Sequence, residues 1–353
     1  MALYVDALLG SERVVAPAAP RTFIKSESFD AALLALPLLT GLAAATVVLA
    51  DARLFAVVLV ADLWLLGYHH VVATYTRLVF TSDALRSNRF LAVDLLLLMT
   101  AGTLVLAFTA GAWVVASAFF YLQWFHYMRQ GYGISRMYFR ATPEGKAIGA
   151  RDPGADFVIY LVPIYAIAAR SATMGGLFLD LPVRTVVLPE VVISVLGLLA
   201  AAATAAWAAR SLASFFRGTL DVLYTCFVLS HIVIFLDAYI LIDNPNIGWL
   251  AINVWHNFQY VLVVWMMNTK RYAGGVDPAA RFISRISQPG RMATYFMSCL
   301  AISTIVYLVL GRFVIAVGGG LAVTVGIYMG INFHHYVVDA LIWKRRRTTP
   351  QVA

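Results

Sequence analysis

Long apolar runs alternate with short polar connections along almost the whole chain. A run of roughly 20 residues is long enough for an α-helix to cross a hydrocarbon core about 30 Å thick. Ten such runs predict an all-α, polytopic membrane bundle with ten transmembrane helices. These predicted helices cover residues 31–50, 53–76, 90–110, 112–135, 156–177, 186–207, 219–242, 248–268, 293–314 and 318–342.

The composition agrees with this pattern. Of the 353 residues, 61% are hydrophobic and 12% are charged, whereas a soluble domain carries about 25% charged residues. We therefore expect a single transmembrane domain over residues 31–343, a cytoplasmic lead-in over residues 1–30 and a basic cytoplasmic tail over residues 344–353. Cys226 and Cys299 both lie in apolar runs, so no disulfide framework is expected.

The net charge of +8 gathers beside the ends of the apolar runs. Lys and Arg are frequent in the connections after the second, fourth, sixth and eighth predicted helices and in the C-terminal KRRR, while the alternate connections are short or acidic. Because basic loops stay on the cytoplasmic side, both termini are expected to be cytoplasmic. The charge therefore sets the membrane orientation and is not a nucleic-acid signal. We expect a bacterial inner-membrane protein in contact with lipid, with no nucleic-acid partner.

Histidine is the residue type that departs most from the apolar pattern. A lone imidazole in a membrane helix is usually an interhelical hydrogen-bonding group. Here, however, all seven histidines fall inside predicted membrane helices, where polar side chains are costly and usually face a partner, a cavity or a metal. The set predicts a buried metal or haem centre. Its members are His69, His70, His126, His231, His256, His334 and His335.

The histidines also share a depth. At about 1.5 Å rise per residue, His69, His126 and His335 lie about 12–15 Å from the basic cytoplasmic ends of their helices. His231 and His256 lie about 21 Å from theirs by the same count. Five helices would therefore place imidazoles in one layer near the middle of the membrane.

The chemistry of the ligands limits which metal ions the site can bind. Neutral imidazole suits iron, copper, zinc and nickel, whereas magnesium and calcium prefer oxygen. No glutamate lies deep in a predicted membrane helix, which excludes a carboxylate-bridged Glu-x-x-His di-iron site. We expect non-haem iron, with one or two ions, and copper or zinc as further possibilities. The predicted ligands are the seven histidines and Asp339, and a hydrogen-bonding role is nearly as well supported for His231.

Other polar residues are predicted to orient these ligands. Residues three, four or seven apart share a face of an α-helix, so Asp62 aligns with His69, and Asp339 aligns with His335. Carboxylates and amides placed in this way accept the free N–H of a ligating imidazole. For Asp62 and Asp94, a salt bridge to Arg129 is an equal alternative. The predicted supporting residues are Asp62, Asp94, Arg129, Gln130, Gln259 and Asn332.

Sequence motifs give no closer assignment. Rossmann, P-loop, HExxH and nucleophile-elbow signatures are absent. Neither His-His pair has a further histidine two to four residues before it, so the histidine boxes of membrane desaturases and hydroxylases are absent too.

The favoured interpretation is an integral membrane metalloenzyme that oxidises a lipid-soluble substrate with O2, by hydroxylation, desaturation or oxidative cleavage. Since no flavin or ferredoxin-like module is present, reducing electrons would come from a separate donor. A haem protein of electron transfer or quinol chemistry is the first alternative, and a transporter of a metal or a small molecule is the second. A purely structural subunit is the remaining possibility.

Overall fold

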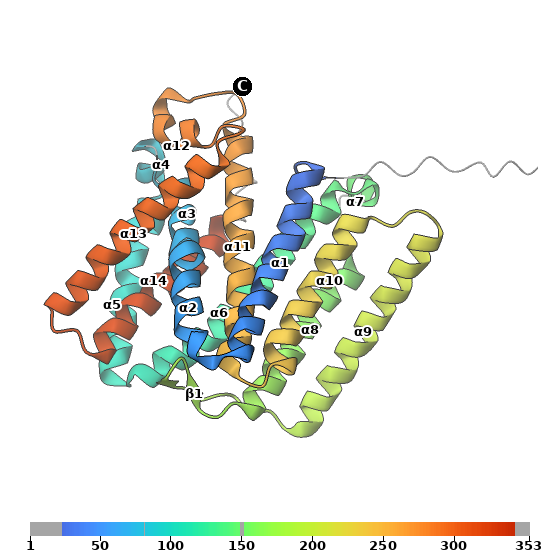
Figure 1. Cartoon of the computed structure of the whole chain (residues 1–353), viewed down its shortest axis with the longest axis horizontal. Coiled ribbons are helices and arrows are strands. Elements are labelled where there is room, and N and C mark those ends of the chain that lie inside the picture. Colours follow the sequence, from blue (N-terminus) through green and yellow to red (C-terminus); the bar gives the residue numbers. More distant parts are fainter. Residues whose placement is uncertain (1–22, 81, 149–151, 343–353) are drawn as a thin grey trace, which may run out of the picture.

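The computed structural model describes residues 23–80, 82–148 and 152–342 (Figure 1). Within these residues the chain is all-α, apart from one short antiparallel hairpin of β1 (Leu177–Phe178) and β2 (Leu181–Pro182). The all-α prediction is therefore confirmed. Most of the predicted lead-in and the whole predicted basic tail lie outside the described residues.

The long helices follow the predicted runs closely. The first three are α1 (Glu27–Ala50), the continuous helix formed by η1 (Ala52–Leu54), α2 (Phe55–Asp62), η2 (Leu63–Gly67) and α3 (Tyr68–Leu78), and the helix formed by η3 (Phe90–Asp94) and α5 (Leu95–Thr109). Next come α6 (Ala112–Ala141), α8 (Pro153–Thr173), α9 (Glu190–Phe216) and α10 (Val222–Leu236), which η4 (Asp237–Leu241) extends. The last are α11 (Pro245–Arg271), α13 (Met292–Ala316) and α14 (Leu321–Ile342).

Eight helices in the described part of the chain are long and apolar enough to cross a membrane, as expected for an integral membrane protein. Two long helices, α6 and α11, fall outside this set although they have 30 and 27 residues. Both contain many polar side chains, and α11 is buried along nearly its whole length. Polar helices of this kind are stable in a bundle when neighbouring helices cover them.

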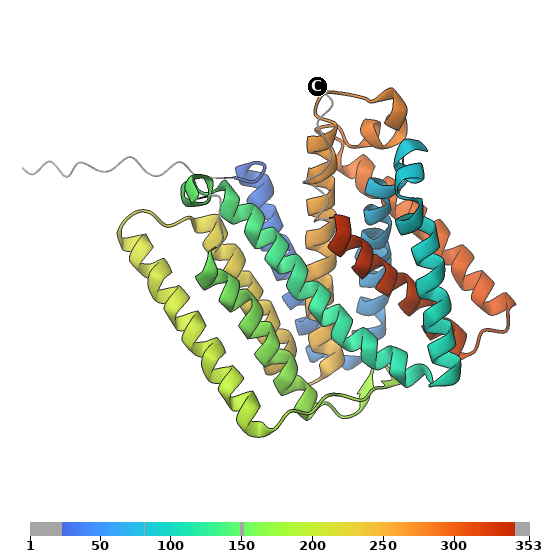
Figure 2. The ribbon, with the colours of Figure 1, turned by 180° about the vertical axis from the view of Figure 1, so that it is seen from behind.

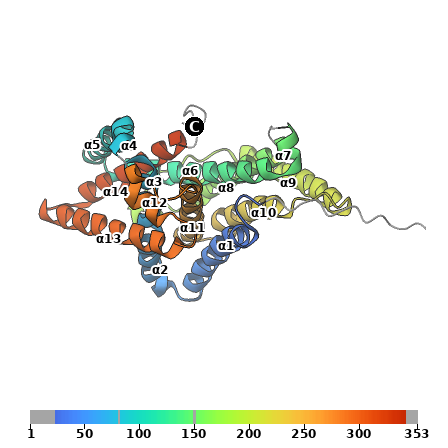
Figure 3. The ribbon, with the colours of Figure 1, turned by 90° about the horizontal axis from the view of Figure 1, so that it is seen from above.

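The views agree on the arrangement of the helices. Helices α1, α8, α9 and α10 form one group, and α2, α3, α5, α13 and α14 form the other, with α6 and α11 between them (Figures 1 and 2). The view from above shows α9 and α13 at the outer ends of the two groups (Figure 3). The short helices α4 (Ser82–Ser87), α7 (Pro143–Ile148) and α12 (Arg281–Ile286) lie at the end of the bundle where α1 begins, opposite the β-hairpin (Figure 1).

Local sequence explains where several helices begin. Ser26 caps α1 by accepting a hydrogen bond from the Phe29 N–H, and Asp221 caps α10 in the same way. Helices α8 and α11 begin with a proline that follows a capping Asp152 or Asn244. Proline suits the first helical position because its missing N–H would have no partner there, and a side-chain oxygen before it satisfies the next N–H groups.

Small residues allow α5 and α14 to cross closely. A Cβ added to Gly330 would lie 2.7 Å from Thr100 Cα, and one added to Gly326 would lie 2.7 Å from the Leu104 side chain. The Thr103 hydroxyl also donates to the Gly326 carbonyl at 2.6 Å. Small residues four apart let membrane helices pack backbone to backbone, so α14 lies directly against α5.

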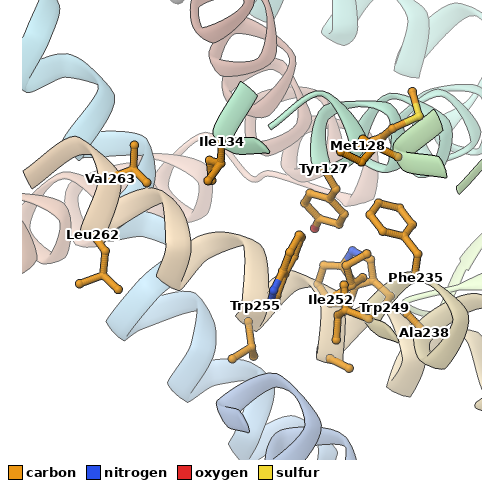
Figure 4. Packing of buried hydrophobic residues seen from close by; sticks show 14 of the residues in the cluster. Tyr127, Met128, Ile134, Phe235, Ala238, Trp249, Ile252, Trp255, Leu262 and Val263 are labelled. Carbon is orange, nitrogen blue, oxygen red and sulfur yellow. The ribbon is translucent and has the colours of Figure 1, made fainter. Parts of the chain in front are cut away.

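Aromatic side chains fill the space between α6, α10 and α11. Figure 4 shows Tyr127 of α6 beside Phe235 of α10 and Trp249 of α11. Trp255 is completely buried and makes edge contact with Phe235 at a centroid distance of 6.4 Å. This packing fixes the face of α11 that carries His256.

Candidate metal centre

Four histidines from four helices meet in the interior of the bundle. His70 comes from α3, His126 from α6, His256 from α11 and His335 from α14, and Asp339 lies one turn beyond His335. In the groups His70–His126–His256 and His126–His335–Asp339, the candidate ligand atoms all lie within 4.8 Å of one another. All five side chains are at least 93% buried. The structure therefore brings together five of the eight predicted ligands.

Hydrogen bonds indicate which ring nitrogen His70 and His335 offer. Nδ1 of His70 lies 2.9 Å from the Gly67 carbonyl oxygen. A carbonyl oxygen only accepts hydrogen bonds, so Nδ1 of His70 carries the proton. Nε2 of the neutral ring is then an unprotonated lone pair, and it faces Nε2 of His335 at 2.8 Å.

A second chain of hydrogen bonds fixes the tautomer of His335. The Tyr260 hydroxyl donates to Asp339 Oδ1 at 2.5 Å, so it accepts a proton from the Thr74 hydroxyl 2.7 Å away. Among the described residues, the only other acceptor for the Thr74 proton is the His70 carbonyl at 3.4 Å, so in either case Thr74 accepts from Nδ1 of His335 at 3.0 Å. His335 therefore also has its proton on Nδ1 and a lone pair on Nε2.

Two lone pairs that face each other at 2.8 Å repel unless a cation lies between them. Two imidazole nitrogens bound at about 2.0–2.1 Å to one ion, at right angles, lie about 2.8–3.0 Å apart. The observed spacing thus matches two neighbouring ligands of one metal ion.

The remaining donors converge on the same point. Nε2 of His126 and both ring nitrogens of His256 are buried, with no hydrogen-bond partner among the described residues. A buried polar atom without a partner costs about 1–3 kcal/mol, and a metal ion removes that cost for the unprotonated nitrogen of each ring. Oδ2 of Asp339 lies 4.0 Å from Nε2 of His126 and 3.8 Å from Nε2 of His335. The set is four imidazoles and one carboxylate.

The π-helical segment η2 explains why His70, and not His69, reaches this point. Regular α-helical spacing predicts that Asp62 and His69 share a face. The wider turn of η2 accommodates one extra residue, so the residue aligned with Asp62 becomes His70. Asp62 and His70 both face α11, where they contact Asn253 and His256. The predicted alignment with His69 was therefore wrong by one position.

Three of the predicted ligands lie elsewhere. His69 approaches the Leu65 carbonyl at 3.3 Å and has its ring edge against Phe296 of α13. His334 lies between the Leu91 carbonyl, at 2.7 Å, and the Tyr75 hydroxyl, at 3.2 Å. His334 therefore has an ordinary interhelical role. His69 approaches a carbonyl of its own helix, its buried Nε2 has no partner among the described residues, and it belongs to neither group of candidate ligands.

His231 joins helices at a different place. Its Nε2 lies 3.2 Å from the Ile159 carbonyl of α8. A Cβ on Gly131 of α6 would lie 2.3 Å from Nδ1 of His231, so the ring packs directly on the α6 backbone. The structure thus places His231 at the contact of α6, α8 and α10, away from the other donors.

Some of the predicted supporting residues lie near the centre, and others do not. Asp62 accepts from the Asn253 amide at 2.5 Å, and the Gln130 amide donates to the His256 carbonyl at 3.1 Å. Gln259 is fully buried, one turn beyond His256, with no described partner for its amide. Asn332 donates to the Tyr328 carbonyl of its own helix at 2.8 Å.

Asp94 and Arg129 do not support the centre. Both are exposed on the bundle surface, and Arg129 donates to the Tyr160 hydroxyl of α8. The alternative of a salt bridge between Asp62 and Arg129 is therefore wrong, because the partners of Asp62 are the amides of Asn253 and Asn257.

Sequence reasoning missed two residues that orient the donors, Tyr260 and Thr74. A signal was present, because each lies four residues after a histidine of the centre. Spacing of four places two side chains on one helix face. Hydroxyl residues are common in these helices, however, and only the structure shows which of them connect with Asp339.

A cavity of about 170 Å³ opens beside the centre, lined by His70 and His256 and otherwise by aromatic, amide and aliphatic side chains. No family model, no curated protein and no solved structure matches this chain. The functional assignment therefore depends on the site itself.

Proposed function

We propose that the protein is an integral membrane metalloenzyme with one non-haem iron ion, which oxidises a lipid-soluble substrate with O2. The observation that carries the proposal is the 2.8 Å approach of Nε2 of His70 to Nε2 of His335, both of which we infer to be unprotonated from the hydrogen bonds at Nδ1. His126, His256 and Asp339 would complete the ligand set. Because these five donors form one connected group, a single ion fits better than a pair.

The donor set favours iron. Imidazole and carboxylate together are typical of non-haem iron in oxygen chemistry, while thiolate and thioether donors select copper(I). Five donors on an octahedral ion leave one position open for O2 or substrate. Copper or zinc at the same donors is the alternative outcome of a metal analysis.

A haem group fits this geometry less well. Axial ligands of a haem lie on opposite faces of the ring, so their nitrogens are separated by about two metal–ligand bonds, or about 4 Å. Nε2 of His70 and Nε2 of His335 are much closer than this. Four convergent imidazoles would also leave two rings without a role.

The reaction needs a defined source of electrons. Hydroxylation converts a C–H bond and O2 into C–OH and water, and it consumes two electrons and two protons. Desaturation removes two hydrogens and reduces O2 to two waters, again with two electrons from outside. Oxidative cleavage of a C=C bond places both oxygen atoms in the products and needs no external electrons. For the first two reactions we propose a separate membrane or cytoplasmic donor.

The setting suits such chemistry. The donors are buried in a water-poor interior, where electrostatic effects are strong and side reactions with water are suppressed. We propose ten membrane-spanning helices, with α6 and α11 included, both termini in the cytoplasm and a location in a bacterial inner membrane. The basic connections and the +8 charge support this orientation.

The test uses purified protein loaded anaerobically with Fe(II), reconstituted in membrane lipids and exposed to ¹⁸O₂ with dithionite-reduced mediator. Mass spectrometry of the lipids should show the gain of one or two ¹⁸O atoms, or the loss of two hydrogens, in a minor lipid component. His126→Ala should abolish the change, while His69→Ala should retain it. Wild-type protein that binds iron but alters no lipid would contradict the oxygenase proposal.

A further inference from the structure

The cavity beside the metal centre carries information about the substrate class. Its volume of about 170 Å³ is below the range of about 300–1,000 Å³ that holds a complete drug-sized ligand. It therefore suits the reacting end of a longer molecule whose remainder lies among lipid. Tyr68, Tyr307 and Tyr328 line it and are only partly buried, so the cavity reaches toward the outer surface along α3, α13 and α14.

Four polar side chains in the cavity wall, those of Gln123, Tyr127, Trp249 and Asn253, are committed to one another or to Asp62. The Asn253 amide donates to Asp62, and its oxygen accepts from Tyr127 at 2.5 Å and from Gln123 at 3.2 Å. The oxygen of Gln123 accepts from the Trp249 N–H at 2.8 Å. These groups hold the wall in place but have little capacity left for a ligand.

Two amide oxygens remain available, and so does the Tyr336 hydroxyl, which is buried in the same wall with no partner among the described residues. The Asn257 amide nitrogen faces Asp62 at 3.4 Å, and the Asn332 amide nitrogen donates to the Tyr328 carbonyl at 2.8 Å. Carboxylate and carbonyl oxygens only accept, so the orientation of both amides is fixed. Their side-chain oxygens, which have no described hydrogen-bond partner, are acceptors in the wall of the cavity.

Charge distinguishes the substrates that these acceptors can bind. None of the described residues that line the cavity is charged. In the metal-free protein, a carboxylate or phosphate would lose its hydration without gaining a cation, which is strongly unfavourable in an apolar site. A neutral hydroxyl instead provides the single donor that an amide oxygen requires.

We propose that the cavity binds the hydroxyl end of a neutral, long-chain lipid alcohol, with Asn257 and Asn332 as acceptors, and that in the metal-free protein it rejects the corresponding acid. The alcohol end then lies next to His70 and His256, so oxidation would occur on carbons close to the hydroxyl group. The inference depends on the proposed function for its chemistry, whereas the binding preference is a property of the cavity alone.

Binding of tritiated tetradecan-1-ol to metal-free protein in lipid nanodiscs tests the preference. The competitors are unlabelled tetradecan-1-ol, its methyl ether, tetradecanoic acid and tetradecylamine, compared at equal mole fraction in the bilayer. Because a buried hydrogen bond contributes about 1 kcal/mol or slightly more, the alcohol should compete about tenfold better than the ether. It should exceed the acid by at least as much, and it should also exceed the amine.

Matched variants separate the cavity from general partitioning. Asn257→Leu should weaken alcohol binding about tenfold and change ether binding less than twofold, since only the acceptor is lost. Asn332→Leu gives a second variant if the first does not fold. Asn268→Leu is the control, because Asn268 is buried on the same helix but contacts Thr76 and Tyr295 outside the cavity.

The inference is overturned if ether, acid or amine competes as well as the alcohol. It is also overturned if wild-type protein and both cavity variants discriminate equally, because this shows partitioning only. If alcohol binding is not selective but the protein binds iron and oxidises lipid normally, the proposed substrate class is wrong and the proposed function stands. Selective alcohol binding by a protein that never binds iron would support the binding preference of the cavity and contradict the proposed function.

Discussion

At the residue scale, the tautomer of His335 is set by two hydroxyl groups on neighbouring helices. Tyr260 of α11 donates to Asp339, and Thr74 of α3 then directs its proton to Tyr260 and accepts from Nδ1 of His335. The result is a lone pair on Nε2, which is the form that binds a metal ion. Residues that orient a ligand in this way typically change metal affinity 10–100-fold when removed.

Tyr260→Phe should therefore weaken iron binding about 10–100-fold without loss of the fold. Without the tyrosine hydroxyl, Thr74 is free to donate to Nδ1 of His335, which favours the tautomer with its proton on Nε2. Competitive titration of Fe(II) against a chelator measures the change.

Tyr295→Phe is the matched control for this experiment, because Tyr295 bonds Thr76 and Asn268 without contact to the donors. Its iron affinity should stay within about twofold of wild type. Equal affinity in Tyr260→Phe and Tyr295→Phe would show that the hydroxyl chain does not select the tautomer.

The sequence alone predicts that histidines form the candidate centre. Imidazole in an apolar membrane helix is energetically costly, so it usually faces a partner, a cavity or a metal. The sequence cannot choose between the members of a His-His pair. The pattern of apolar residues predicts the same burial for His69 as for His70, and the same burial for His334 as for His335. Their separation depends on helix phase and on contacts such as the Leu91 carbonyl, which arise only in the assembled bundle.

At the scale of single elements, η2 shows the limit of prediction from spacing. The sequence places a helix over residues 53–76, and the structure has one over Ala52–Leu78, so its existence and extent were predictable. The π-helical turn inside it was not, because nothing in the sequence Leu63–Gly67 distinguishes it from ordinary α-helix. One extra residue in that turn rotates all following side chains by about 100° relative to those before it.

The crossing of α5 and α14 is the second element that positions the centre. Gly330 lies five residues before His335, and a Cβ there would lie 2.7 Å from Thr100 Cα and from the Thr103 hydroxyl. Gly330→Ala should push α14 away from α5 and cost about 1–3 kcal/mol through overpacking. We expect a lower thermal unfolding midpoint together with weaker iron binding.

Gly133→Ala on α6 provides the comparison, since a Cβ at Gly133 has nothing within 4 Å. Replacing glycine by alanine inside a helix stabilises it by about 1 kcal/mol, so this variant should unfold at the same temperature or higher and bind iron normally. If Gly330→Ala behaves in the same way, the close crossing does not hold His335 in place.

At the scale of the whole molecule, two helices that are too polar to be recognised as membrane-spanning by composition lie in the centre of the bundle. They carry His126 and His256, and the apolar helices around them provide the low-dielectric surroundings. The sequence predicted both as membrane-spanning helices over residues 112–135 and 248–268, and did not predict that their neighbours enclose them. The sequence does not predict which helices are in contact, because contact between helices far apart in the sequence depends on loops and packing.

The orientation of the bundle can be tested with two exposed glycines that have open space around them. Gly175 lies beside the β-hairpin, and Gly274 lies in the basic connection after α11. In a Cys226→Ser background, Gly274→Cys should react with an impermeant maleimide only from the cytoplasmic side and Gly175→Cys only from the opposite side. Labelling of both from the same side would contradict the proposed topology.

The metal content of purified protein tests the central claim most directly. Elemental analysis after Fe(II) loading and desalting should find close to one iron per wild-type chain and close to one in His334→Ala, whose native side chain faces Leu91 and Tyr75. His335→Ala should retain less than a tenth of that amount, because it loses one of the two facing Nε2 lone pairs. Equal iron in the two adjacent variants, or no transition metal in wild-type protein, would contradict the account.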